Sequence, residues 1–248
     1  MSSPNDASSW TQVAKLTAAD GASGDNFGYR LAIGDGTIVV AAHHDDDKGS
    51  SSGSAYVFEM SSPGDASSFT QVAKLTADDG ASKDWFGRVA VGDGTIVVGA
   101  PCDDDHGSCS GSVDVFEKSS SDDPSSWKQV AKLTADDGAA DDRFGVQVGV
   151  SDGTIVVSAQ ADDDKGYNSG SAYLFQKSSS DDASSWTQVA KLTVDDGANK
   201  DVFGISVAIN DGTVVVTAGR SDAKGTDSGA AYVFEMSSPG DASSFTQV

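Results

Sequence analysis

The sequence predicts an all-β protein made of four similar units in a row. A Phe-Gly pair recurs at nearly constant spacing, each pair is followed by an Asp-Gly turn and an apolar run such as Thr-Ile-Val-Val, and no stretch has a helical period. A fixed period of this size is typical of solenoids, propellers and other repeat arrays. The four pairs begin at Phe27, Phe86, Phe144 and Phe203, at spacings of 59, 58 and 59 residues.

Each unit contains four strand signals. The first strand follows Phe-Gly, as in residues 29–33, and the Asp-Gly of residues 34–36 supplies the positive φ that a tight hairpin needs. The second strand, residues 37–42, is apolar and rich in β-branched residues, as expected where both faces are covered. A loop rich in Asp, Ser and Gly, which we call the middle loop, leads to the third strand at residues 54–58. A Ser-rich linker leads to the fourth strand.

Four short antiparallel strands per unit are the pattern of a propeller blade. We therefore expect a β-propeller of four four-stranded antiparallel blades, forming a single domain over residues 1–248. The expected blades cover residues 27–76, 86–134, 144–193 and 203–248. A further strand is expected at residues 10–17, and residues 231–248 are identical to residues 55–72. Two arrangements stay open: a closed four-bladed ring in which the strand at 10–17 completes the fourth blade, or a fragment of a longer array.

The second unit is one residue shorter than the others. From the Phe to the turn Asp the distance is seven residues between Phe86 and Asp93, but eight in the other three units. A one-residue deletion reverses the facing of side chains unless a bulge absorbs it. We therefore expect a local distortion near Arg88 and Val89.

Composition excludes several classes of partner. The formal net charge of -22 argues against binding to nucleic acid or to anionic membrane surfaces. No apolar run approaches the roughly 20 residues needed to cross a bilayer, so membrane insertion is not expected. The first residues have neither a basic segment nor an apolar core, so no signal peptide is visible. Cys102 and Cys109 lie seven residues apart in one loop, where a local disulfide and two reduced thiols are both compatible with the spacing.

Acidic residues concentrate in two kinds of loop that an antiparallel meander brings to the same end. These are the middle loops and the loops between one unit's fourth strand and the next unit's first strand, which we call entry loops. Three middle loops repeat an Asp-x-Asp-x-Gly pattern, and the candidate cation ligands are Asp45, Asp47, Asp103, Asp105, Asp162 and Asp164. Carboxylate oxygens of this kind suit a weak Ca²⁺ site. The alternative is that Asp forms the turns by capping loop N–H groups, with the surplus charge giving solubility.

Phe86-Gly87 followed by Gly99-Ala100-Pro101 resembles the FG-GAP repeat family, the blade type of integrin α-subunit head propellers. The resemblance covers nearly the whole chain from Trp10, although the other units replace Gly-Ala-Pro. It implies an extracellular or cell-surface location and a role in adhesion or binding, with a protein or glycan ligand on the acidic end. The family's calcium loop, Asp-x-Asp-x-Asp-Gly, is reduced here to turns such as Gly34-Asp35-Gly36. One carboxylate cannot replace that ligand set, so the family's usual calcium site is not carried over.

No catalytic constellation is evident, and we expect no enzymatic activity and no cofactor apart from Ca²⁺. Residues 49–53 match the Gly-x-Ser-x-Gly pattern of a nucleophile elbow, but the strand-turn-helix context that the motif requires is missing. We also assign no function to Lys residues that recur in each fourth strand, because surface ion pairs contribute only about 0–1 kcal/mol. These residues are Lys15, Lys74, Lys132 and Lys191.

The sequence thus favours a non-catalytic binding or adhesion module of an exported or cell-surface protein. Two alternatives stay open, a structural repeat array of a wall or extracellular matrix and an accessory domain of a larger enzyme.

Overall fold

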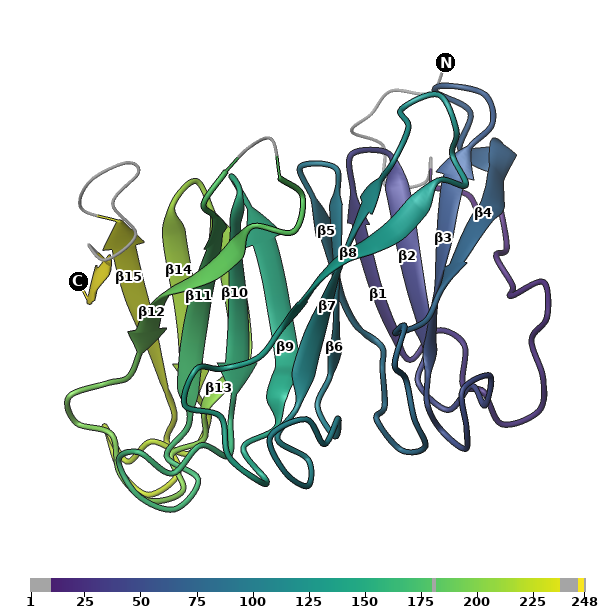
Figure 1. The fold of residues 1–248 in the computed structure, drawn as a ribbon. Helices are drawn as coiled ribbons and strands as arrows, with labels where there is room; N and C mark the ends of the chain where they lie inside the picture. The colour runs from purple at the N-terminus through teal and green to yellow at the C-terminus, as the bar shows by residue number, and fades with distance from the viewer. Residues whose placement is uncertain (1–9, 180–181, 237–244, 248) are drawn as a thin grey trace.

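The computed structural model describes residues 10–179, 182–236 and 245–247, which form four antiparallel sheets of four strands each (Figure 1). In order, the sheets contain β1 (Arg30–Gly34), β2 (Thr37–Ala42), β3 (Ser54–Met60) and β4 (Phe69–Leu75); β5 (Arg88–Gly92), β6 (Thr95–Ala100), β7 (Ser112–Lys118) and β8 (Trp127–Leu133); β9 (Phe144–Ser151), β10 (Thr154–Ala159), β11 (Ser171–Lys177) and β12 (Trp186–Leu192); β13 (Phe203–Asn210), β14 (Thr213–Ala218), β15 (Ala230–Met236) and β16 (Phe245–Gln247). The predicted all-β class and the four four-stranded blades are confirmed. Among the described residues, no helix is long and apolar enough to cross a membrane.

The local structure follows from the residues in the way the sequence predicts. Asp35 and Gly36 adopt φ angles of 51° and 75° in the turn between β1 and β2, which is the conformation that a two-residue hairpin requires. The apolar strands β6 and β10 are buried at every position. They lie inside their sheets and are covered on both faces, which explains why they lack the alternation of a half-exposed strand.

Neighbouring blades pack through the strand that begins each blade. β5 lies against β1 and β2, β9 against β5 and β6, and β13 against β9 and β10. The Phe of each Phe-Gly pair fills the core beneath it: Phe144 packs edge-to-face on Tyr173, with ring centroids 5.4 Å apart. The core clusters therefore combine side chains of two successive blades, as the repeat architecture requires.

The described blades form an open row, with the first and fourth blades at opposite ends (Figure 1). β14 alternates between buried and part-buried positions, unlike β6 and β10, because no blade in the described part of the chain covers its outer face. Leu31 and Ile33 of β1 are likewise exposed. Residues 10–18 are in no strand, although Leu16 and Ala18 pack on the first core. Ring closure through residues 10–17 stays a prediction, and residues 237–244 and 248 of the expected fourth blade lie outside the described residues.

The distortion expected near Arg88 is absent. β5 pairs with β6 in unbroken register, whereas β9 and β13 shift register near their starts. In those longer units the additional residue, Val146 or Ile205, donates its N–H back to the entry loop. The second blade lacks this residue and its strand runs straight. The prediction was wrong because the bulge belongs to the longer units, not to the shorter one.

Candidate functional site

The middle and entry loops meet at one end of the row, the lower end in Figure 1. The middle loops are residues 43–53, 101–111, 160–170 and 219–229, and the entry loops are residues 18–29, 76–87, 134–143 and 193–202. Each of the first three middle loops is bonded to the next entry loop, as where the Phe86 N–H donates to the Ser52 carbonyl at 3.0 Å. Gly53 (φ 87°) has no room for a side chain, since a Cβ there would lie 2.0 Å from the Phe86 carbonyl oxygen.

A lysine lies at the centre of the acidic group in the second blade. Lys132 Nζ is 2.9 Å from Asp103 Oδ2, 2.6 Å from Asp105 Oδ2 and 2.6 Å from Asp79 Oδ2. Asp103 and Asp105 belong to the middle loop and Asp79 to the entry loop, while Lys132 comes from β8. One ammonium group therefore ties the fourth strand to both loops of its own blade.

The same arrangement occurs in the first and third blades. Lys74 contacts Asp20, Asp45 and Asp47, and Lys191 contacts Asp137, Asp162 and Asp164. In both blades a tyrosine also donates its hydroxyl to the inner carboxylate, at 2.8 Å from Tyr56 to Asp45 and from Tyr173 to Asp162. Each of these groups is a network of polar side chains around one buried carboxylate, with a lysine as its cation.

Electrostatics within these groups favour the ionised forms of both partners. Burial works to lower the pKa of Lys132, but hydrogen bonds to Asp105, Asp79 and Asp103 outweigh it and raise the pKa. Burial works to raise the pKa of Asp45, while hydrogen bonds from Tyr56 and Lys74 lower it by more. Each lysine side chain is only 17–18 % exposed. Our expectation of ordinary surface pairs was wrong for Lys74, Lys132 and Lys191, because the β-strand register carries them into the loops.

The structure thus brings together the aspartates that the sequence singled out, blade by blade. The inner residues Asp45, Asp103 and Asp162 are buried and each also accepts the N–H of the residue two positions later, as a turn-forming Asp does. The outer residues Asp47, Asp105 and Asp164 are exposed. Asp79, Asp103 and Asp105 are close enough to share a metal ion, but their carboxylates surround Lys132. Of the two alternatives that the sequence left open for these six aspartates, a Ca²⁺ site stays a hypothesis that a Ca²⁺ titration tests.

The lysines were not predicted as members of this site. The signal was present, because a Lys follows each fourth-strand aromatic residue at a fixed offset, as Lys132 follows Trp127 and Lys191 follows Trp186. This recurring lysine could be assigned to the site only once the strand pairing was known, because the pairing sets Lys74 opposite Tyr56 and so next to Asp45.

The second blade differs at one buried position of this network. Asp114 stands where the first and third blades have Tyr56 and Tyr173. It is fully buried and accepts one hydrogen bond from Gln129 Nε2 at 2.7 Å, while its other oxygen has no partner among the described residues. Burial raises the pKa of Asp114 well above its ordinary value.

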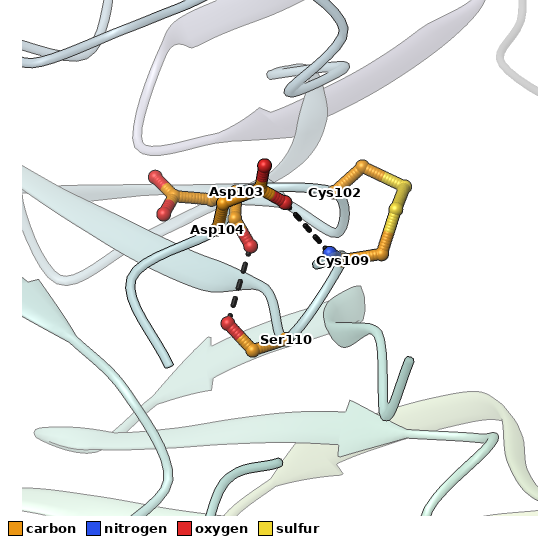
Figure 2. Close-up of a disulfide and its surroundings, with 5 residues drawn as sticks. All are labelled: Cys102, Asp103, Asp104, Cys109 and Ser110. Atoms are coloured by element: carbon orange, nitrogen blue, oxygen red, sulfur yellow. Dashed lines mark hydrogen bonds between the residues drawn. A yellow bond between two sulfur atoms is a disulfide. The ribbon is translucent and has the colours of Figure 1, made fainter. Parts of the chain in front are cut away.

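A disulfide joins Cys102 and Cys109 and closes the middle loop of the second blade (Figure 2). The same loop is held by the Cys109 N–H donating to Asp104 Oδ1 at 2.8 Å. In the first blade the two equivalent residues are His44 and Ser51, whose Nδ1 and Oγ atoms are 3.0 Å apart in a hydrogen bond. The sequence left the state of the thiols open; the structure has them bonded.

Two kinds of surface remain available to a ligand at this end. One is the acidic rim, which consists of the exposed aspartates Asp20, Asp46, Asp47, Asp78, Asp79, Asp104, Asp105, Asp136, Asp137, Asp141, Asp163, Asp164, Asp195, Asp196, Asp222 and Asp227. The other is a cavity of about 590 Å³ between the third and fourth blades, whose lining includes Arg143, Tyr167 and Arg220. The cavity combines cationic and aromatic groups that were not predicted as site residues, because Arg143, Tyr167 and Arg220 come from three separate loops.

Comparison with known proteins gives the family. The model of the family described as FG-GAP repeat matches residues 10–58, 69–116, 127–175 and 186–234. These four segments span most of the chain and each ends within the third strand of a blade. A comparison with curated proteins found no match.

Proposed function

Because the chain belongs to the FG-GAP repeat family, we propose that it is a non-catalytic binding or adhesion module of an exported or cell-surface protein. Repeats of this family form propeller-type modules that are often extracellular. The Cys102–Cys109 disulfide supports an exported location, since disulfides persist mainly in oxidising compartments.

The observation that carries the proposal is the acidic rim. The inner carboxylates are neutralised by lysines, so the charge offered to a ligand is that of the exposed aspartates on every blade. Surface carboxylates in such number attract a partner of opposite charge and speed its association. We therefore assign a basic protein segment as the ligand. A glycan is the alternative partner, for which the cavity with Tyr167 is the more suitable surface.

The test uses a fluorescent Lys/Arg-rich peptide and measures binding by anisotropy at increasing salt. Asp136→Asn with Asp195→Asn removes two rim charges whose side chains form no hydrogen bond among the described residues. The matched control, Asp122→Asn with Glu235→Gln, removes two exposed charges that lie toward the opposite end of the blades. We expect several-fold weaker binding for the rim variant only, and affinity that falls with salt in every variant. No binding, or equal loss in both variants, would contradict the proposal.

A further inference from the structure

In the second, third and fourth blades, one face is completed by residues of the blade before it. At the three junctions within the chain, two residues of the third strand and one of the second enter the core shared with the next blade. They are Val39, Ala55 and Val57; Val97, Val113 and Val115; and Val156, Ala172 and Leu174, all 0 % exposed. The equivalent residues of the fourth blade are Val215, Ala231 and Val233. They are exposed or only part-buried and belong to none of the cores of the described residues.

The first blade carries the other half of this junction. Leu31 and Ile33 of β1 are 66 % and 69 % exposed. Their counterparts pack into the core shared with the preceding blade: Val89 and Val91, Val148 and Val150, and Val207 and Ile209. Within the described ranges, the first core, which contains Val40 and Tyr56, receives no residue from a preceding blade. The first blade thus lacks the side chains that complete a core, and the fourth blade exposes the side chains that complete one at the other junctions.

Backbone hydrogen bonds show the same complementarity. At the first junction the N–H groups of Lys83, Trp85 and Phe86 donate to the carbonyls of Ser50, Ser51 and Ser52 at 2.8, 3.3 and 3.0 Å. Equivalent bonds form at the second and third junctions. The counterparts at the two ends are the N–H groups of Gly24, Asn26 and Phe27 and the carbonyls of Thr226, Asp227 and Ser228. None of these six groups has a partner among the described residues.

We propose that the chain associates head to tail with a second copy of itself, the fourth blade of one copy packing against the first blade of the next. The partner is a second copy because the exposed faces of the first and fourth blades repeat the two surfaces that pack together at the three junctions within the chain. The two faces differ, so the contact is heterologous, and it either closes into a ring or extends as a filament. The copies carry like charge, so added salt strengthens this association, whereas it weakens the binding of a basic ligand to the acidic rim.

Sedimentation velocity over a range of protein concentrations, at low and high salt, tests the proposal. Leu31→Asp alters the face of the first blade and Ala231→Asp that of the fourth, both at exposed positions that tolerate substitution. The control Tyr167→Asp changes an exposed side chain outside both faces. We expect the wild type and the control to associate more as concentration and salt rise, and each face variant to remain monomeric on its own.

Mixing the two face variants gives the sharpest result. A Leu31→Asp copy keeps an intact fourth-blade face, and an Ala231→Asp copy keeps an intact first-blade face, so the mixture forms a dimer that neither variant forms alone. A wild type that remains monomeric at every concentration and salt would overturn the proposal. So would face variants that associate like the wild type, or a mixture that gives no dimer when the wild type associates.

Discussion

Lys132 Nζ lies 2.9 Å from Asp103 Oδ2, and the equivalent contacts are Lys74 to Asp45 at 3.1 Å and Lys191 to Asp162 at 3.0 Å. Each joins a β-strand to the buried carboxylate of a middle loop in the same blade. The aspartates that resemble cation ligands in the sequence therefore already have a cation, supplied by the chain itself. These groups of one lysine and three aspartates hold the middle and entry loops in place.

Replacing Lys132 with Gln should destabilise the protein by about 2–4 kcal/mol, because the change leaves Asp103 buried without its counter-charge. Urea unfolding measures the change in the free energy of unfolding. Lys15→Gln is the matched control, since Lys15 is exposed and forms no ion pair among the described residues; a surface change of this kind is worth less than about 0.5 kcal/mol. Equal stability of the two variants would contradict the structural role.

Asp114→Asn should stabilise the protein at neutral pH. Burial raises the pKa of Asp114 in the folded state, so the folded protein holds this proton more tightly than the unfolded chain. The contribution to stability is fully present below the unfolded pKa and is lost as pH rises through the folded pKa. The variant has no proton to lose there, so its stability should fall less than that of the wild type as the pH rises from acid to neutral.

Urea unfolding at a series of pH values checks this expectation, with the exposed Asp122→Asn as control. A wild type and an Asp114→Asn variant with the same pH dependence would show that Asp114 does not titrate above the ordinary carboxyl range.

Opening the disulfide should weaken the second blade's middle loop. Cys102→Ser with Cys109→Ser removes a cross-link over a sequence separation of 7, for which loop-closure entropy gives about 2 kcal/mol. A hydrogen bond between the two serines, like that of His44 and Ser51 in the first blade, would recover part of the loss. Thermal unfolding should show a reductant-sensitive midpoint in the wild type only. A wild-type midpoint that reductant leaves unchanged would contradict the prediction.

Val202→Asn should stabilise the fourth blade. Val202 has φ 54°, a left-handed conformation that is unfavourable for a β-branched residue. Asn26 occupies the equivalent position of the first blade with φ 56°, and Asn tolerates this conformation well. We expect a gain of about 1 kcal/mol, with a smaller gain for Val202→Ala. Unchanged or lower stability of the Asn variant in urea unfolding would contradict this interpretation.

Much of the fold could be predicted from the sequence because its determinants are local. The hairpin at Asp35 and Gly36, the buried second strands and the repeat period all follow from residues close together in the chain. Predicting the candidate site would have required the strand pairing as well. Lys74 meets Asp45 across 29 residues, and only the pairing of β3 with β4 shows it. The exposure of the faces at the two ends of the row could not be predicted either, because the sequence pattern does not say whether Leu31 and Val215 are covered.

Thermal unfolding of the wild type and of Lys132→Gln, in excess EDTA and then in millimolar Ca²⁺, tests whether the lysine takes the place of a metal ion. A ligand that binds only the native state raises the midpoint as its concentration rises. We expect the wild-type midpoint to shift no more than at matched ionic strength. The midpoint of Lys132→Gln should rise with Ca²⁺, because Asp79, Asp103 and Asp105 are freed together. A rise of several degrees in the wild type, lost on Asp103→Asn with Asp105→Asn, would contradict this role of the lysine and make these aspartates a Ca²⁺ site.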